Sequence, residues 1–383
     1  MIHLALLILA WLTLIGVVFS MAMVIRAGKL VPSLEDYSGR RHGGRVSVVV
    51  AARDEGPNVE AALVSLLAQD YPDFEIIAID DRSNDDTGAI LDRMATTHHR
   101  LKVLHVRELP AGWLGKNNAL HRGAELASGE YLLFTDADIV FAPDALSRTV
   151  AFFEERRLDH LTLGPEMDSP GLALTLVVNF FSLGFLGYYR PWLAQDPDRE
   201  EHIGIGAFNL VRTSLYRSFG GHERIALRPD DDIKLGRLVK LARGRQMVAG
   251  GRGVIRVRWY SSVGELARGL RKNTFAGMHY SLAVAATAIV ANFAVNVWPF
   301  VALLFVSGVL WWLNAAIALT LMLMYFAVAT VAGQKPWLAI GYPIAGLIFT
   351  YIMAVAVWQP LMRGGIEWRG TFYPLAELRK NRV

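Results

Sequence analysis

The chain has 383 residues, 53% of them hydrophobic, and a mean hydropathy of +0.31. This apolar content is too high for an ordinary soluble protein, yet a charged fraction of 19% is too high for a chain that lies wholly in a membrane. Cysteine is absent, so disulfide bonds and thiolate metal sites are excluded, and any metal must be held by oxygen or imidazole ligands. The net charge of +4 favours anionic partners such as lipid headgroups and phosphate-bearing ligands.

Apolar stretches at 2–25, at about 281–332 and at 337–358 predict membrane spans. Each is long enough for a hydrocarbon core of about 30 Å, and the middle one could cross twice. The predicted organisation is an N-terminal anchor at 1–27, an α/β domain at 28–277, a membrane region of two to three spans with a possible interfacial helix at 278–360, and a basic tail at 361–383.

The first span lacks a preceding basic region and a clear cleavage site, which predicts a retained anchor. Because Arg26, Lys29, Arg40 and Arg41 follow it, the positive-inside rule places the α/β domain on the cytoplasmic side of an inner membrane. Three later spans would put the C-terminus outside, whereas the positive charges of the tail favour the cytoplasm; they are Arg363, Arg369, Arg379, Lys380 and Arg382. Either 281–293 lies along the interface and the later spans number two, or the charge rule fails here.

Between the apolar regions, β-branched runs alternate with segments of helical periodicity. The predicted strands are 45–52, 74–79, 101–106 and 131–135, and the predicted helices are 58–69, 86–95 and 117–127. This alternation predicts a doubly wound, mostly parallel α/β sheet, in which ligands bind outside the carboxyl ends of the strands. A further apolar helix at 172–189 is expected to lie against the membrane or the core.

Acidic residues close three of the predicted strands, at 54–55, 80–81 and 136–138. Asp136 and Asp138 place two carboxylates in one turn, as Mg²⁺ or Mn²⁺ bound to phosphate oxygens requires. Asp80 or Asp81 could accept hydrogen bonds from a nucleobase or ribose, while Asp85 or Asp86 caps the next helix.

Three further charged segments carry alternative interpretations. Lys116 follows a glycine-rich turn with the wrong spacing for a nucleotide-triphosphate loop, but it begins a helix and could meet a diphosphate. The acids at 230–232 open another helical pattern, where one could act as a general base or all could simply stabilise the helix N-terminus. Arg268 and Arg271 could form a basic patch at a lipid surface or clamp a leaving diphosphate.

With these residues in order, the stretch from about Arg45 to Arg271 resembles the family 2 glycosyltransferases with the GT-A fold. The matching segments are 46–55, 79–83, 136–138, 204–212, 220–222 and 231–235. The resemblance implies an inverting transfer from a nucleoside-diphosphate sugar, with Asp232 as the base beside Asp231 and a divalent metal on Asp136 and Asp138. It also implies a nucleotide-sugar site formed by Arg53, Glu55, Asp80, Asp81, Lys116, Asp136, Gly206, Arg268 and Arg271.

One departure from the family bears on the acceptor. Lys272 stands where the membrane synthases commonly carry a tryptophan after two arginines, which weakens the case for a processive polysaccharide synthase. The segments 112–116 and 269–273 and the arrangement of spans are most similar to hopene-associated, carotenoid-pathway and ceramide-glucosyltransferase-like members. This similarity implies a membrane lipid acceptor of polyprenyl, hopanoid or sphingoid type, and no nucleic acid partner.

Two alternatives stay open. The first is a polysaccharide synthase. The second is a non-catalytic membrane protein that senses nucleotide sugars, against which the three acidic strand ends and Asp232 argue.

Overall fold

The computed structural model describes residues 2–39 and 43–380. Arg40, Arg41 and Arg382, which belong to the predicted basic flanks, lie outside the described residues. The chain forms two compact units. The first consists of the chain through Leu30, Ser169–Arg190 and Tyr260–Trp368, and the second of Val31–Asp168, Pro191–Trp259 and the chain from Arg369 onward. The units therefore alternate along the chain, whereas consecutive domains at 1–27, 28–277, 278–360 and 361–383 are predicted from the sequence.

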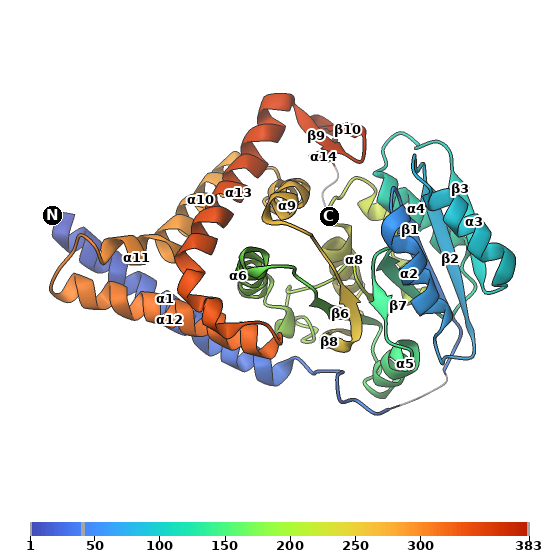
Figure 1. The fold of residues 1–383 in the computed structure, drawn as a ribbon, viewed down its shortest axis with the longest axis horizontal. Helices are drawn as coiled ribbons and strands as arrows, with labels where there is room; N and C mark the ends of the chain where they lie inside the picture. The colour runs from blue at the N-terminus through green and yellow to red at the C-terminus, as the bar shows by residue number, and fades with distance from the viewer. Residues whose placement is uncertain (1, 40–42, 381–383) are drawn as a thin grey trace. The chain divides into compact units, whose positions relative to one another are not determined.

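The second unit is built on one sheet with the strand order β3-β2-β1-β4-β7-β6-β8-β5 (Figure 1). β3, β2, β1 and β4 run parallel, as does β6 with β8, while β7 and β5 pair antiparallel with their neighbours. The predicted mostly parallel α/β class is thereby confirmed. The strands are β1 (Val46–Ala52), β2 (Phe74–Asp81), β3 (Leu101–Val106), β4 (Tyr131–Asp136), β5 (Val140–Phe141), β6 (His160–Met167), β7 (Asn209–Arg212) and β8 (Gln246–Val257).

Helices cover both faces of this sheet, which explains why strands such as β1 are apolar on both sides. On one face the core includes Val59 and Leu63 of α2, Leu91 of α3 and Val150 of α5. On the other face α4, α7 and α8 pack against the strands. The helices of this unit are α2 (Gly56–Leu67), α3 (Thr87–Thr97), α4 (Gly115–Leu126), α5 (Ala145–Glu155), α7 (Thr213–Ser218) and α8 (Asp231–Leu241), with the 3₁₀ turns η1 (Pro191–Leu193) and η2 (Gly221–Ile225). The chain from Arg369 adds β10 (Thr371–Pro374) and α14 (Leu375–Leu378).

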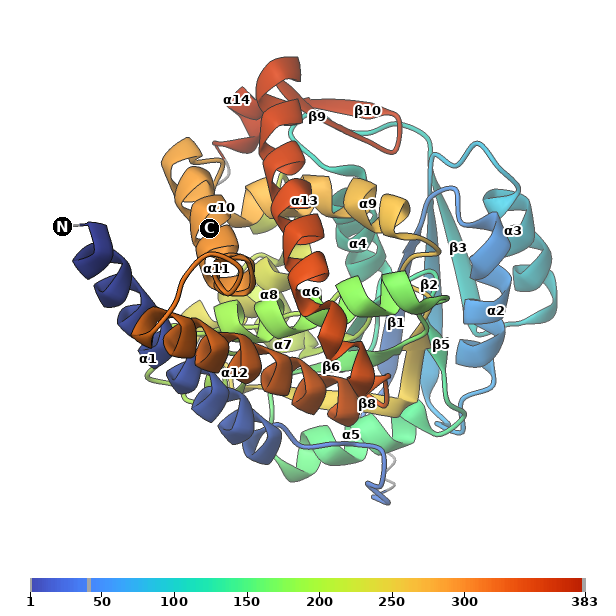
Figure 2. The same cartoon turned by 60° about the vertical axis from the view of Figure 1, so that its left-hand side comes forward.

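The first unit is almost entirely helical (Figure 2). Its elements are α1 (Ile2–Leu30), α6 (Leu172–Tyr189), α9 (Val263–Gly277), α10 (Leu282–Asn296), α11 (Trp298–Ala302), α12 (Val309–Val331), η3 (Pro336–Gly341), α13 (Tyr342–Arg363) and β9 (Gly365–Trp368). Among the described residues, four stretches are long and apolar enough to cross a membrane: His3–Leu30, Leu172–Leu193, Val309–Val331 and Pro336–Arg363. α1 and α12 lie side by side, and α1 leaves large apolar side chains such as Phe19 exposed.

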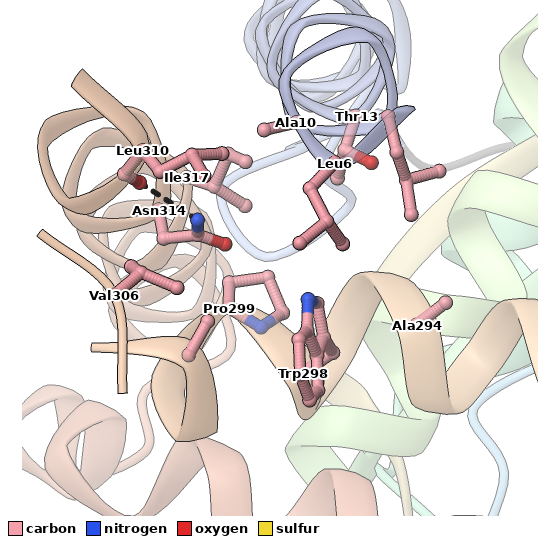
Figure 3. Close-up of a pocket in the computed structure, with 12 residues that line it drawn as sticks. Leu6, Ala10, Thr13, Ala294, Trp298, Pro299, Val306, Leu310, Asn314 and Ile317 are labelled. Carbon is pink, nitrogen blue, oxygen red and sulfur yellow. Dashed lines mark hydrogen bonds between the residues drawn. The ribbon is translucent and has the colours of Figure 1, made fainter. Parts of the chain in front are cut away.

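Figure 3 shows a small cavity of the first unit, lined by residues of α1, α10, α11 and α12. Its walls are mainly apolar and include Leu6, Trp298 and Pro299. The amide of Asn314 donates to the carbonyl oxygen of Leu310 at 2.8 Å. No titratable side chain lines this cavity, so the chemistry must be sought in the second unit.

Candidate active site

The acidic strand ends meet at one edge of the sheet, as the sequence predicts. In the parallel registers, Ala52 of β1 lies opposite Asp80 of β2, and Ala51 lies opposite Asp136 of β4. Parallel neighbours end at the same edge, so the loops after β1, β2 and β4 open onto a common region. The site can therefore be built from the side chains that these loops carry.

Lys116, in the first turn of α4, is the cation at the centre of an acidic cluster. Its Nζ lies 2.6 Å from Oδ1 of Asp136 and 3.6 Å from Oδ2 of Asp231. Burial opposes the charged ammonium, but Asp136, Asp231 and Asp232 outweigh that effect and raise the pKa of Lys116 above its ordinary value. The lysine therefore stays protonated where the sequence analysis expects a diphosphate.

These groups border a narrow recess in the second unit, which we call the acidic recess. It is lined by Lys116, Leu120, Phe134, Thr135, Asp136, Gly206, Asn209, His222, Asp231, Asp232 and Leu235. The two predicted catalytic acids, the predicted lysine and one predicted metal ligand thus lie around a single space.

Asp232 is held at the start of α8 by two backbone amides. Its Oδ2 accepts from the N–H of Gly206 and its Oδ1 from the N–H of Ile233, each at 2.8 Å. Burial, then repulsion from Asp231, raises the pKa of Asp232 to about 7 despite the nearby Lys116. A carboxylate that is fixed in orientation and titrates near neutrality suits a general base.

Asp230 has a different environment from its two neighbours Asp231 and Asp232. The guanidinium of Arg228 donates to both of its oxygens at 2.8 and 2.7 Å, and both side chains are buried. The buried amide of Asn117 then binds the carbonyl oxygens of Ile225, Ala226 and Arg228. These contacts fix the turn before α8 against the start of α4, so the recess is assembled from both helices.

The loop 204–206 closes one wall of the recess and requires glycine. A Cβ on Gly204 would overlap the carbonyl oxygen of Asp232, and one on Gly206 would lie 2.7 Å from Oδ2 of Asp136. The Gly206 carbonyl accepts from the N–H of Asp136 at 3.2 Å. Asn209 supports the loop by donating to the Ile205 carbonyl at 2.9 Å. The structure thus brings the predicted Gly206 into contact with Asp136 and Asp232.

The predicted nucleotide residues at the end of β2 have different environments. Asp80 is buried, with Oδ1 accepting from the N–H of Ser83 at 3.1 Å and Oδ2 2.9 Å from Nδ1 of His105. Asp81 accepts from the guanidinium of Arg82 at 2.8 and 3.0 Å and lies 3.8 Å from Arg53. Hydrogen bonds with Asp80 and then Asp92 raise the pKa of His105 above its ordinary value.

The predicted helix cap is confirmed at Asp85 rather than Asp86. Asp85 accepts from the N–H of Thr87 at 3.0 Å and from the N–H of Gly56 at 2.9 Å. Asp86 occupies the N-cap position of α3 but makes no side-chain cap hydrogen bond. Asp85 therefore joins the loop after β1 to the start of α3.

Glu55 and Arg53 contact the C-terminal segment, which the sequence presents only as a basic tail. The guanidinium of Arg369 lies 2.5 Å from Oε1 of Glu55 and also donates to the backbone carbonyl oxygen of Arg53. Tyr373 is buried, and its hydroxyl accepts from the N–H of Gly115 at 3.4 Å. The segment from Arg369 onward is thus part of the same unit as the nucleotide loops.

The predicted metal ligands have the chemistry of a hard-cation site. Burial, then Asp136 and Glu55, raises the pKa of Asp138 to about 7, as expected for a carboxyl among carboxylates. A divalent cation would relieve that repulsion, and carboxylate oxygens are its preferred ligands. Within 2–39 and 43–380, however, no cluster of three or more acidic or histidine side chains is arranged to hold a metal. The role of Asp136 and Asp138 as ligands of a cation that completes its coordination with phosphate oxygens stays a prediction.

Arg268 and Arg271 lie on α9, in the first unit. Arg271 donates to Oε1 of Gln359 at 2.5 Å within that unit. Their predicted role at the diphosphate stays a prediction.

Three residues near the site were not predicted to be functional from the sequence: His105, Asn117 and Arg369. His222 lies in the segment 220–222 that matches the family, but it was given no role of its own. His222 is 1% exposed, lines the recess and shares a hydrogen bond with Tyr216. Its position directly after the paired glycines Gly220 and Gly221 was the local signal, and its hydrogen bond with Tyr216 is visible only in the fold.

The sheet topology and the acidic strand ends of the second unit are those of the GT-A fold. Residues 47–219 match the family model described as "Glycosyl transferase family 2". This stretch is therefore similar to the glycosyltransferase family 2 domain. A solved mannosyltransferase from Pyrobaculum calidifontis, in complex with GDP-Man and Mn²⁺, has a similar fold, with a TM-score of 0.55 at 19% identity, covering 93% of this chain and 99% of that one.

Two curated relatives match part of the chain. A beta-monoglucosyldiacylglycerol synthase of Trichormus variabilis is 34% identical over 115 residues, which is 30% of this chain and 24% of the relative. A poly-beta-1,6-N-acetyl-D-glucosamine synthase of Staphylococcus epidermidis is 37% identical over 177 residues, 46% of this chain and 41% of the relative. The chain thus spans less than half the length of these relatives.

Proposed function

We propose that the protein is an inverting glycosyltransferase that moves a sugar from a nucleoside-diphosphate sugar to a hydroxyl of a membrane lipid. The observation that carries this proposal is the acidic recess, where Lys116, Asp136 and Asp231 surround a space next to the amide-held Asp232. The recess supplies a cation for phosphate and a base of suitable pKa within one site.

In the proposed reaction, the acceptor hydroxyl attacks the anomeric carbon. Its proton passes to a carboxylate oxygen of Asp232, while the bond from that carbon to the phosphate oxygen breaks and its electron pair leaves with the nucleoside diphosphate. Lys116 neutralises charge on the diphosphate. Asp136 and Asp138 would hold a divalent metal, which supplies further stabilisation of the departing phosphate when bound. Arg53, Glu55, Asp80 and Asp81 form the nucleoside part of the site.

The lipid acceptor is supported by the four candidate spans and by the resemblance to a glucosyldiacylglycerol synthase. A polyprenyl, hopanoid or sphingoid alcohol would keep its tail in the bilayer while its hydroxyl reaches Asp232. We further propose that the protein is a multi-pass inner-membrane protein with the second unit in the cytoplasm, where nucleotide sugars are made. Arg26 and Lys29 at the end of α1 support this orientation.

A polysaccharide synthase is the second candidate, because the poly-N-acetylglucosamine synthase also matches nearly half of the chain. A transfer assay distinguishes these two functions. It contains purified protein, Mg²⁺ or Mn²⁺, native lipid extract and one radiolabelled nucleotide sugar at a time from a panel. A product that partitions into organic solvent supports lipid glycosylation, and a water-soluble polymer supports the synthase. The absence of transfer from every donor would refute both, and a chelator should abolish transfer until metal is restored.

A further inference from the structure

His222 is a polar side chain in the acidic recess that the proposed reaction does not use. Its side chain is almost fully buried and lines the recess together with Phe134, Asp136 and Asp231. Its ring packs edge to face on Phe134, with centroids 4.7 Å apart. A buried imidazole beside charged groups must have its hydrogen bonds accounted for.

Tyr216 determines which nitrogen of His222 carries the proton. The backbone N–H of His222 donates to the Tyr216 hydroxyl at 3.1 Å, and that hydroxyl lies 2.8 Å from Nδ1. The Tyr216 side chain is buried, so its own O–H would lack an acceptor unless Nδ1 accepts it. Nδ1 is then the acceptor, and the hydrogen of the neutral ring lies on Nε2. Burial, then Lys116, lowers the pKa of His222 to about 3, which keeps the ring neutral.

Nε2 is therefore a hydrogen-bond donor whose direction in the ring is fixed. Among the described residues it has no protein partner, while Nδ1 is taken by Tyr216. Because His222 lines the recess, Nε2 is the polar atom that the ring offers to a ligand there.

The position of His222 relates it to the sugar rather than to the nucleoside. Lys116 and Asp136, which we assign to the diphosphate and metal, border the same recess, and so does the base Asp232. The transferred sugar must lie between the diphosphate and the base. We propose that His222 is a specificity-determining residue that donates a hydrogen bond from Nε2 to one hydroxyl of the transferred sugar. This inference rests on the proposed function, which it extends to sugar recognition.

The test compares wild-type protein with His222→Phe, His222→Gln and His121→Phe. His121→Phe is the matched control, because His121 lies outside the recess and stacks on Trp113. UDP-glucose, UDP-N-acetylglucosamine and GDP-mannose are the first probes. The donor that wild type uses best is then supplied as its single-deoxy analogues, and kcat/KM is measured for each.

For the wild type, we expect that removal of the hydroxyl at one position of the donor sugar lowers kcat/KM by roughly 10- to 100-fold. His222→Phe should lose this discrimination, because it has no donor, and His222→Gln should retain part of it. His121→Phe should behave as wild type. Binding of the free nucleoside diphosphate reports folding and should be equal in all four proteins.

The assignment of His222 to sugar recognition is overturned if His222→Phe discriminates between the sugar and its deoxy analogue as strongly as the wild type does. If His222→Phe fails to bind the nucleoside diphosphate, the result for His222→Gln is used instead. Glutamine can still donate a hydrogen bond, so a complete loss of discrimination between the sugar and its deoxy analogue in His222→Gln also overturns the assignment. Absence of transfer by wild type from every donor refutes the proposed function instead, so the two failures are distinguishable.

Discussion

Asp232→Asn should abolish most of the transfer while leaving donor binding intact. The substitution keeps the size of the side chain but removes the group that accepts the proton. General-base catalysis typically contributes about 10²- to 10⁴-fold, so kcat should fall by that factor. The Kd of the nucleoside diphosphate should not change, because Lys116 and Asp136 remain.

The structure adds a stability cost to this variant. Both oxygens of Asp232 accept from backbone amides, those of Gly206 and Ile233. Asparagine offers one carbonyl oxygen, so one of the two N–H groups must face the NH₂ group and loses its partner. An unmatched buried donor costs about 1–3 kcal/mol, and the melting temperature should fall accordingly.

Three measurements on the same preparation separate these effects: single-turnover transfer with radiolabelled donor, calorimetric titration with nucleoside diphosphate, and thermal melting. Asp168→Asn serves as the control, because Asp168 is exposed and its side chain pairs with Arg258 at the surface. A kcat for Asp232→Asn within about threefold of wild type, at unchanged affinity, would refute its role as the base.

Three further predictions concern the neighbouring groups. Lys116→Met should raise the KM for the nucleotide sugar by at least about tenfold, because a charge-assisted contact is lost, and an unchanged KM in steady-state assays would contradict its diphosphate role. Arg369→Ala should weaken nucleoside-diphosphate binding by roughly two- to fivefold, because it removes the ion pair that holds the loop of Glu55. Substitution of the exposed Lys380 by alanine should leave this binding unchanged, and equal titration curves for the two variants would refute a role of Arg369 in binding. The kcat/KM of the wild type should rise with pH through about 7, because below this pH Asp232 already carries the proton that it must accept, and a flat profile between about pH 5.5 and 8 would contradict that pKa.

The sequence predicted the parallel half of the sheet because its signals are local. β1 and β4 are short apolar runs, and the acids that follow them mark the strand ends without reference to the rest of the chain. The position of Asp232 at a helix start was also predictable, since the acids precede a helical pattern.

Contacts between distant segments could not be predicted in the same way. Arg369 and Glu55 are 314 residues apart, and nothing near either residue indicates the other. The antiparallel strand β7 has four residues, too few to give a clear alternation. Arg228 and Asp230 are only two residues apart, but the sequence does not show that Arg228 pairs with Asp230 through two of its nitrogens.

In the membrane arrangement that we propose, the contact between Arg369 and Glu55 would limit how the chain can pass through a bilayer. The segment before Tyr260 and the segment after Trp368 both belong to the second unit. If the second unit lies on one side of a bilayer, as we propose, the chain between them would leave and return to that side, and we expect an even number of crossings there rather than three. By the same parity we expect that α6, which is flanked in the chain by segments of the second unit, would not cross although it is one of the four candidate spans. In that proposed arrangement the C-terminal charges would share a compartment with the sheet, as the positive-inside rule predicts.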